Sequence, residues 1–599
     1  RFTLTRQPEF PPERDTSLEE ARIGVFVCSC GSNIGGFLDV PGVAEYTAAL
    51  PNVIHSEWNL YACSQDSIRH ITEQVKVLRL NRVVVASCSP LTHQPLFQDS
   101  LRAAGLNPYL FEMANIRNQC SWVHSHDWEV ATSKAKDLVR MSVARAALLE
   151  PQHAVDIPIQ TAALVVGGGV AGMTAALALA NQGFPVHLVE QSEHLGGNLR
   201  SIRSLAWRSE PEGIEFEPGA ILDTLVRRTS AHPNIQLHLE SRVVASTGFM
   251  GNFTSTIQRS NGERLETGHG VTILATGAQE YRGPEYGFGS DERILTQLQL
   301  ETFLEEQPEA IHQLRSVAII QCIGPAEKFC SRVCCSVSLK NALRLKQINP
   351  SAEVVILHQD IRTYGFKERL YSEARRQGVI FVRYQADRKP RVEIGKAIDV
   401  RIFDPGLKRT LHLQPDLVVL SMPVVPRQDA PALAGLFKVA RDADGFFQEA
   451  HVKLRPVDFA SDGIFMAGMA HYPKLLDETM IQAQAAAARA ARVLNRTALT
   501  AGGRVAIVDT QKCTGCLTCV RICPFGVPKI KADLTGVGGI IGAAYIEAAV
   551  CQGCGSCVAE CPARAIQLMH FTDEQMLAKV GALFETAPVM VEIGTADEE

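Results

Sequence analysis

The chain has 599 residues, of which 46% are hydrophobic and 21% are charged, and its formal net charge is −5. This length predicts about three or four domains with large apolar cores. The acidic balance argues against a nucleic-acid partner, and the sequence has no run of about 18 uncharged apolar residues that would form a membrane span. Residues 1–15 lack the apolar core of a secretory signal. The chain does not begin with Met, which leaves open whether residues precede Arg1.

The chain contains seventeen cysteines, several of them in CxxC spacings. In a large chain without a secretory signal, such spacings favour reduced thiolates that bind iron over disulfides. The cysteines therefore predict an iron–sulfur protein of the cytoplasm.

Residues 1–21 are rich in Pro and charge and are expected to extend across the surface or along a partner. Residues 22–150 alternate between strand and helix patterns and predict an α/β domain. Cysteines follow its strands, so they would meet at the carboxyl edge of a parallel sheet, where ligands bind: Cys28, Cys30, Cys63, Cys88 and, further on, Cys120. This spacing leaves two interpretations open, a metal cluster or buried free cysteines.

Residues 162–190 have the pattern of a dinucleotide-binding unit: an apolar strand, a glycine turn, an Ala/Leu helix, and a second strand that ends in an acid. The first glycine would permit a tight turn, the next would let backbone amides approach a pyrophosphate, and the acid would accept a hydrogen bond from a ribose. A purely structural glycine turn is the alternative. The predicted contacts are Gly167, Gly169, Val170, Ala171, Gly172, Glu190 and Gln191.

Three later stretches favour FAD over a nicotinamide cofactor. They are a Gly-Gly pair, VTILATGA at residues 271–278, and GIFMAGMA at residues 463–470 before an Ala-rich helix at about 479–494. They resemble the FAD contacts of the thioredoxin-reductase class of flavoproteins, and they predict a flavin domain over residues 151–500. The region between Gly197 and Val271 reads as polar, weakly structured strands. The added contacts are Gly196, Gly197, Asn198, Ala275, Thr276, Gly277, Gly468 and Met469.

The strand at residues 316–320 begins a second half of this domain, where a nicotinamide-binding protein would continue with GxGxxG. Four cysteines replace that loop: Cys322, Cys330, Cys334 and Cys335. Four soft ligands so close together suit a cubane iron–sulfur cluster or zinc, and they predict poor use of NADH or NADPH. Lys340 follows on the next predicted helix and, by itself, would be taken for a surface charge.

Two CxxCxxCxxxCP runs, at residues 513–524 and 551–562, form the pattern of a bacterial two-cluster ferredoxin, and they predict such a domain over residues 501–570. In this pattern the fourth cysteine of each run binds the cluster of the other. A helix over 571–585, within the segment 571–599, would cap its own domain or dock a partner. The predicted ligand sets are Cys513, Cys516, Cys519 and Cys561 for one cluster, and Cys551, Cys554, Cys557 and Cys523 for the other.

Together these motifs resemble the HdrA family of heterodisulfide reductase subunits and its bacterial relatives, from Arg22 to the last helix. The motifs that carry the resemblance include VFVCSCGSNI, VVVASCSP, NIRNQCSWVH, GGGVAGMTAA, FCSRVCCSVSLKNAL, DIRTYGF and the tandem ferredoxin. The resemblance implies an α/β protein with a thioredoxin-reductase-like two-part FAD domain, an N-terminal α/β iron–sulfur domain and a C-terminal α+β ferredoxin domain. It further implies clusters at the N-terminal cysteines and at CxxxCC, and it places Lys340 beside the reactive flavin nitrogen as a catalytic residue.

Four [4Fe–4S] clusters need sixteen thiolates and the chain has seventeen. The extra one is expected to be Cys28 or Cys30, and we take Cys30 as the ligand, with Cys63, Cys88 and Cys120. Long family members carry a further ferredoxin module within the flavin domain. The corresponding region after Gly197 has no cysteine here, so the chain is expected to be a short form.

FAD among one-electron clusters converts electron pairs into single electrons. In the family this conversion is electron bifurcation, in which a two-electron donor reduces a high-potential acceptor and low-potential ferredoxin. The implied partners are B- and C-type subunits, ferredoxin, and an electron-input subunit linked to hydrogenase, formate or NADH, and a homodimer is compatible. The sequence shows no residues for disulfide cleavage, which is assigned to partners. The alternatives are a non-bifurcating electron-transfer scaffold and an NAD(P)H-dependent oxidoreductase like the glutamate synthase small subunit.

Overall fold

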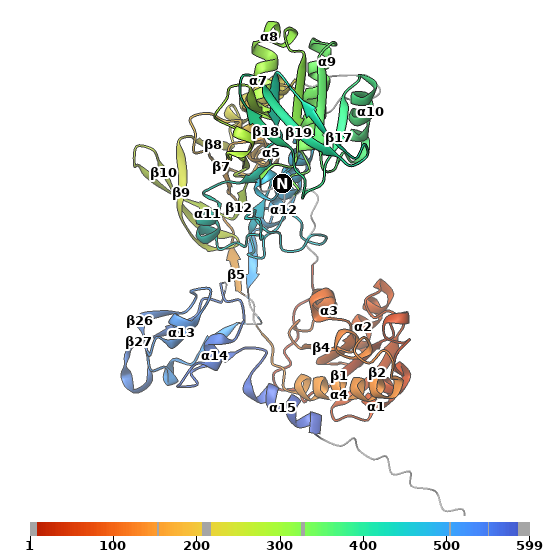
Figure 1. Cartoon of the computed structure of the whole chain (residues 1–599). Helices are drawn as coiled ribbons and strands as arrows, with labels where there is room; N and C mark the ends of the chain where they lie inside the picture. Colours follow the sequence, from red (N-terminus) through yellow and green to blue (C-terminus); the bar gives the residue numbers. More distant parts are fainter. Residues whose placement is uncertain are drawn as a thin grey trace, which may run out of the picture. The chain divides into compact units, whose positions relative to one another are not determined.

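The structure is a computed structural model that describes residues 9–152, 155–205, 217–324, 330–501, 503, 505–548 and 550–584. It divides into two compact units (Figure 1). Residues 158–499 form the larger part of unit 1, whereas residues 3–157 and 500–599 together form unit 2. The two ends of the chain, which the sequence predicts as separate domains, thus belong to one compact unit.

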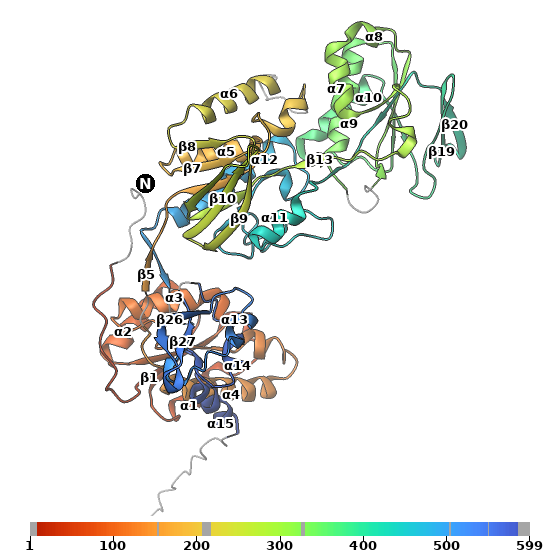
Figure 2. The same cartoon turned by 90° about the vertical axis from the view of Figure 1, so that its left-hand side faces the viewer.

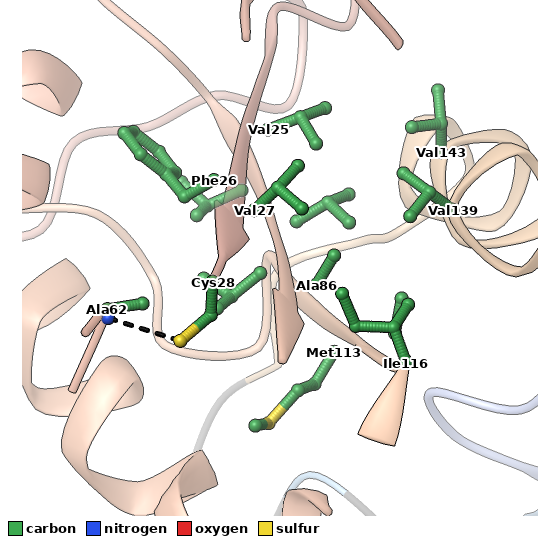
Figure 3. Packing of buried hydrophobic residues seen from close by; sticks show 14 of the residues in the cluster. Val25, Phe26, Val27, Cys28, Ala62, Ala86, Met113, Ile116, Val139 and Val143 are labelled. Carbon is green, nitrogen blue, oxygen red and sulfur yellow. Dashed lines mark hydrogen bonds between the residues drawn. The ribbon is translucent and has the colours of Figure 1, made fainter. Parts of the chain in front are cut away.

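The N-terminal part of unit 2 is a parallel four-stranded sheet in the order β2-β1-β3-β4. The inner strands β1 and β3 are buried along their whole length, which explains their unbroken apolar runs. Figure 3 shows valines of β1 facing Val139 and Val143 of α4 across this core. The elements are β1 (Ile23–Cys28), α1 (Val40–Ala48), β2 (Val53–Asn59), α2 (Gln65–Val77), β3 (Arg82–Ser87), α3 (Pro90–Ala103), β4 (Phe111–Asn115) and α4 (Trp128–Ala147).

The extension before this sheet lies on its own domain. The Arg14 backbone N–H donates to the Gly105 carbonyl at 2.7 Å, and its guanidinium donates to the Leu80 carbonyl at 2.9 Å. Asn107 donates to Glu13 at 2.8 Å. Of the two expected courses, residues 9–21 therefore take the one across the surface, and residues 1–8 lie outside the described residues.

The C-terminal part of unit 2 consists of two small antiparallel ladders and two short helices: β25 (Ala506–Val508) with β28 (Ile566–Leu568), β26 (Lys529–Thr535) with β27 (Ile541–Tyr545), α13 (Thr518–Ile522) and α14 (Ser556–Ala559). The last helix, α15 (Asp573–Phe584), packs against α4. Arg140 Nε donates to the Ala582 carbonyl at 2.7 Å, and Gln575 Nε2 donates to the Leu148 carbonyl at 3.0 Å. The helix therefore ties the C-terminal part of unit 2 to the N-terminal part.

The first half of unit 1 is a parallel five-stranded sheet in the order β23-β12-β6-β7-β8. Helices α5 and α12 cover it and contact each other. The elements are β6 (Ala163–Val166), α5 (Val170–Ala180), β7 (Val186–Val189), α6 (Pro218–Ser230), β8 (Ile235–His238), β12 (Val271–Leu274), β23 (Ile464–Met466) and α12 (Leu476–Leu494), with the antiparallel strands β9 (Ser241–Phe249), β10 (Asn252–Arg259) and β11 (Arg264–His269).

The second half of unit 1 is another parallel sheet, in the order β14-β21-β15-β16-β17, with an antiparallel layer of β18, β19 and β20 (Figure 2). Its elements are β14 (Ile294–Thr296), α7 (Gln297–Glu306), α8 (Pro308–His312), β15 (Ser316–Ile320), α9 (Cys334–Ile348), β16 (Glu353–His358), α10 (Glu368–Arg376), β17 (Ile380–Arg383), β18 (Arg391–Ile394), β19 (Ile398–Asp404), β20 (Arg409–Leu413) and β21 (Leu417–Leu420). Strands β13 (Ala278–Glu280) and β22 (Val424–Pro426) pair with each other, helix α11 (Ala430–Phe437) follows, and β5 (Val155–Pro158) pairs with β24 (Ala498–Ala501).

The predicted α/β class with a two-part flavin-type domain is confirmed by these two sheets. The region after Gly197 differs from the prediction, because it contains the helix α6 besides its strands. Pro218 begins this helix at a position that Pro favours, but its mostly polar sequence concealed it. Among the described residues, no helix has the length and apolarity needed to cross a membrane.

Candidate functional site

A cavity of about 600 Å³ opens at the carboxyl ends of the first sheet in unit 1. This size is in the range of cofactor pockets. The cavity is lined by thirteen of the residues predicted to contact FAD: Gly167, Gly169, Val170, Ala171, Glu190, Gln191, Gly196, Gly197, Asn198, Ala275, Thr276, Gly277 and Met469.

Two other predicted contacts do not line it. A Cβ on Gly172 would lie 1.8 Å from the Gly167 carbonyl oxygen, so this glycine allows α5 to pack closely on the turn before it. A Cβ on Gly468 would lie 2.7 Å from the Ala171 Cβ. Both glycines are needed for close packing behind the cavity wall.

The cavity has an electropositive wall and an oriented carboxylate. Helix α5 begins after Gly169, and in the described part of the chain no side chain caps its first N–H groups. Such a helix start attracts phosphate. Across the turn, Glu190 accepts from the Gly168 N–H at 2.6 Å and from the Ser192 N–H at 2.9 Å. These bonds fix the carboxylate at the end of β7, where it would meet a ribose.

Sequence reasoning missed two further parts of the lining. Some missed residues stand beside the predicted contacts: Val166, Val189, Ser192, Leu199, Ile202 and Ala278. The others lie outside the glycine motifs, on β9, on or just before α11, and on or just before α12: Ser241, Arg242, Val243, Val244, Arg427, Asp429, Ala432, Leu433, Leu436, Lys474, Leu476 and Thr479. Lys474 had one available signal, since it stands between the last flavin motif and its helix.

Lys340 lies on α9 and is buried, but it does not line this cavity. Its Nζ forms an ion pair with Glu301 and donates to the Ser204 carbonyl at 2.9 Å. Glu301 also accepts from the Arg203 N–H at 2.8 Å. Burial lowers the pKa of Lys340, while Glu301 opposes that change. The pair thereby holds the segment after Asn198, and Asn198 itself lines the cavity.

The N-terminal cysteines follow the parallel strands of unit 2. Cys28 ends β1 and accepts from the Ala62 N–H at 3.4 Å (Figure 3). Burial, helped by the thiols of Cys30 and Cys63, raises the pKa of Cys28 to about 11, while the Ala62 N–H opposes the change. Burial likewise raises the pKa of Cys88, with a contribution from Cys63. Electrostatic interactions therefore link Cys30 to Cys28, Cys28 to Cys63 and Cys63 to Cys88.

The structure does not bring Cys120 into this group. The Cys120 thiol donates to the Ala131 carbonyl at 3.0 Å. Burial raises the pKa of Cys120 to about 11, and the charge that opposes this change is that of Lys134, not of another cysteine. Cys120 lies in a helical turn after the edge strand β4, and from there it faces α4. Of the four predicted ligands, Cys30, Cys63 and Cys88 thus come together with Cys28.

The CxxxCC cysteines meet between β15 and α9. Cys322 follows β15 with a positive φ of 60°, and Cys334 and Cys335 begin α9. Burial raises the pKa of Cys334, and the thiols of Cys335, Cys330 and Cys322 raise it further, which places all four near one another. Residues 325–329 between them lie outside the described residues.

The C-terminal cysteines surround two small, mostly apolar cavities. One is lined by Cys513, Cys516, Cys519 and Cys561, and the other by Cys523, Cys551, Cys554 and Cys557. Backbone N–H groups donate to four of the sulfurs: Ala544 to Cys513 at 3.4 Å, Ala565 to Cys561 at 3.3 Å, Ala506 to Cys551 at 3.4 Å and Val527 to Cys523 at 3.5 Å. Such bonds tune cluster potentials. Within the described ranges, no three His, Cys, Asp or Glu side chains are arranged to hold a single metal ion.

Two family models match the chain. One, described as an NAD(P)-binding Rossmann-like domain, matches residues 165–227, and the other, a 4Fe-4S dicluster domain, matches residues 505–562. Among solved structures, the chain is similar to Lactococcus lactis thioredoxin reductase. The superposition covers 56% of this chain and 98% of the reductase, at 16% identity and a TM-score of 0.40.

The chain is 34% identical to the A-type subunit of the Methanothermobacter thermautotrophicus "H(2):CoB-CoM heterodisulfide,ferredoxin reductase", over 95% of this chain and 98% of that protein. It is 33% identical to the A-type subunit of the Methanosarcina acetivorans "Ferredoxin/F(420)H(2)-dependent CoB-CoM heterodisulfide reductase", over 85% of this chain and 75% of that protein. The first alignment spans 665 positions, more than the 599 residues of the chain, so that relative carries residues that this chain lacks.

The dinucleotide-binding and 4Fe-4S domains support FAD and iron–sulfur clusters as the cofactors, and the cavities described above fit both groups. Together with the curated relatives, they make the protein an oxidoreductase. The chain belongs to the HdrA family of heterodisulfide reductase subunits.

Proposed function

We propose that the chain is the FAD- and iron–sulfur-containing electron-transfer subunit of a heterodisulfide-reductase-like complex and the site of its electron bifurcation. The observation that supports this most is the presence, in one chain, of a dinucleotide cavity and several groups of four cysteines. FAD, when bound, exchanges electrons in pairs, while each cluster carries one. Such a protein can divide an electron pair between two acceptors.

The cavity residues would hold FAD in a definite direction. The N–H groups at the start of α5 would bind the pyrophosphate, and Glu190 would accept from the adenosine ribose. Asn198 donates to the Ala278 carbonyl at 2.9 Å, which joins two segments of the cavity wall. The flavin half would then lie toward the second half of unit 1.

Lys340 is the proposed catalytic residue. Its ion pair with Glu301 is buried, and both side chains bind backbone groups of residues 203–204, next to the cavity. The proposal takes the role of Lys340, a hydrogen bond or positive charge to the reactive flavin nitrogen, from the family resemblance. The structure adds that the pair holds the segment beside the cavity.

Four [4Fe–4S] clusters are proposed. The C-terminal sets are those that line the two cysteine cavities, and the third uses the CxxxCC cysteines. For the N-terminal cluster we propose Cys28, Cys30, Cys63 and Cys88, with Cys120 as the seventeenth cysteine, because the first four thiols are neighbours and Cys120 faces α4.

The names of the relatives indicate the reaction class. One names H₂, the CoB-CoM heterodisulfide and ferredoxin, and another names ferredoxin and F420H₂. For this chain we propose ferredoxin as one acceptor, B- and C-type subunits for the disulfide chemistry, a separate electron-input subunit, and a cytoplasmic location. A homodimer is part of the same proposal. The non-bifurcating scaffold and the NAD(P)H-dependent oxidoreductase are the competing functions.

An anaerobic redox titration tests the cofactor set. Flavin absorbance and cluster EPR are followed together, and iron and FAD are quantified in the same sample. About sixteen iron atoms per FAD are expected from four clusters. About eight would leave only the two ferredoxin-type clusters and would refute the four-cluster proposal.

A second experiment separates bifurcation from passive transfer. In the reconstituted complex, Lys340→Ala should uncouple reduction of ferredoxin from reduction of the high-potential acceptor. Lys396→Ala, at an exposed lysine between β18 and β19, is the matched control and should leave coupling intact. Equal coupling in both variants would favour the scaffold.

A further inference from the structure

The wall of the flavin cavity contains a buried lysine, Lys474, whereas Lys340 lies outside this wall. Lys474 lines the cavity just before α12 and is 6% exposed. Its Nζ donates to the Tyr472 carbonyl at 3.3 Å and lies 3.0 Å from the centroid of the Tyr472 ring. In the described part of the chain, the Lys474 ammonium forms no ion pair.

The strand order shows which end of the cavity Lys474 occupies. In the order β23-β12-β6-β7-β8, the glycine turn follows β6, Glu190 ends β7, and Lys474 follows β23. Neighbouring strands lie about 4.8 Å apart, so the ends of β7 and β23 are separated by about 14 Å across the sheet. A dinucleotide with its phosphates at α5 and its ribose at Glu190 must direct its other half toward Lys474.

The nearby carboxylates are already engaged. Glu449 pairs with His471 at 2.9 Å, and Glu478 pairs with Arg332 at 2.5 Å. In the cavity wall, Arg427 bonds to Asp429, and Glu190 accepts the backbone bonds described above. The titratable and charged groups that face Lys474 or its cavity are Arg332, Glu449, Glu478, His471, Tyr472, Arg242, Arg427, Asp429 and Glu190.

This environment disfavours a charged lysine until a negative charge enters the cavity. Burial and the positive charge of Arg332 together lower the pKa of Lys474 to about 6, although Glu478 and Glu449 oppose the change. A buried ammonium without a counter-ion is costly, and an anion beside it removes that cost. The cavity therefore offers a site at which a cation forms only when a ligand becomes negative.

We propose that Lys474 contacts the isoalloxazine half of FAD and takes up a proton when the flavin is reduced, so that its ammonium faces the negative charge of the reduced ring. This inference rests on the proposed FAD site. When bound, FAD would accept two electrons from the reduced iron–sulfur clusters of the protein together with one proton. The neutral Nζ of Lys474 would take up a second proton, so that two electrons and two protons would be consumed in all. Lys340 differs, because its ammonium is already paired with Glu301.

The pH dependence of the flavin midpoint potential tests this proton. The FAD-loaded full chain is titrated with dithionite and mediators at about pH 7.5 to 8.5. A tenfold change in an equilibrium corresponds to about 30 mV for a two-electron couple, so two protons per electron pair give about 59 mV per pH unit and one proton gives about 30 mV. The wild type and the control Lys396→Met should show the steeper slope.

Two variants should behave differently. Lys474→Met should show a slope of about 30 mV per pH unit. Its preference for reduced over oxidised flavin should fall about tenfold, which lowers the midpoint potential by about 30 mV. Lys474→Arg stays charged, so it should also show the shallow slope but a higher midpoint than the Met variant. Equal slopes in the wild type and Lys474→Met would overturn the inference.

A measurement on the wild type needs no variant. Acetic anhydride labels amines of the full chain, before and after loading with FAD or ADP, and mass spectrometry gives the labelled fraction of Lys474. FAD should protect the amine and ADP should not. Equal protection by ADP would assign Lys474 to the pyrophosphate, and no protection in FAD-loaded protein would remove it from the site. FAD content is measured in each sample, so a failure to bind FAD would instead overturn the proposed function.

Discussion

The contact between α15 and α4 contains a buried ion pair whose removal should release the C-terminal helix. Arg145 on α4 is 2% exposed and pairs with Glu112 of β4, which is 6% exposed. Arg145 also donates to the His570 carbonyl and packs over the Phe571 ring, 4.3 Å from its centroid. On the other side, Lys579 of α15 donates to Glu112 at 2.8 Å. Glu112 is therefore the anion shared by both cations.

Glu112→Gln keeps the shape and removes the charge. Breaking a buried pair by neutralising one partner costs about 3–5 kcal/mol, and each 1.4 kcal/mol is about a tenfold change in an equilibrium. If that cost falls on docking, the undocked population of α15 rises by about 100- to 1,000-fold or more. Lys579→Met removes only the partly exposed cation, a contact worth about 0.2–1 kcal/mol. It should change the population by about fivefold or less.

Hydrogen exchange of the peptide that covers residues 573–584 measures the undocked population. Glu112→Gln should lose most of the protection of this peptide, Lys579→Met should lose little, and the peptides of unit 1 should be unchanged. Iron and FAD content are determined in parallel, to show that the rest of the chain is intact. Similar protection in the two variants, or full protection in Glu112→Gln, would refute the role assigned to the buried pair.

The remaining predictions concern the N-terminal cluster, pH and nicotinamides. Cys28→Ser should lose about four iron atoms per FAD while Cys120→Ser keeps them, and the opposite result would restore Cys120 as the ligand. Burial lowers the pKa of His238 and of His269 to about 4, from 6.5. The unfolded chain thus binds protons first, and the free energy of unfolding, measured with denaturant, should fall as the pH drops from about 6.5 to 4 and fall less in His238→Gln. The purified chain should oxidise NADH and NADPH only slowly, and fast steady-state oxidation would revive the NAD(P)H-dependent alternative.

Local patterns were the most informative part of the sequence. Each CxxCxxC run places three thiols on one short loop, so only the fourth cysteine of each set comes from a distant part of the chain. The expected four cysteines line each of the two cavities. The glycine turn after β6 was equally local, since a Cβ on Gly172 would lie 1.8 Å from the Gly167 carbonyl oxygen. Where backbone geometry requires a residue type, the sequence alone was sufficient to find it.

Long-range packing set the limit of prediction. The direction of the Cys120 thiol depends on α4, and the docking of α15 depends on a helix more than 400 residues earlier in the chain. The burial of Lys474 arises from Tyr472 and from the cavity walls supplied by α11 and β9. None of these has a periodic or spaced signature, because each results from segments that meet only in the folded chain.

Unit 1 is an insertion within unit 2, and this affects the order of synthesis on the ribosome. Residues 158–499 emerge as one continuous segment, whereas the N-terminal sheet must wait for residues 500–599 before its unit is complete. Domains generally fold as they emerge, N-terminal first. Here the surface of α4 that receives α15 stays uncovered until residues 573–584 have been translated. A nascent chain stalled before that point would bind FAD but leave this surface accessible to chaperones, which makes the last helix the step that completes assembly.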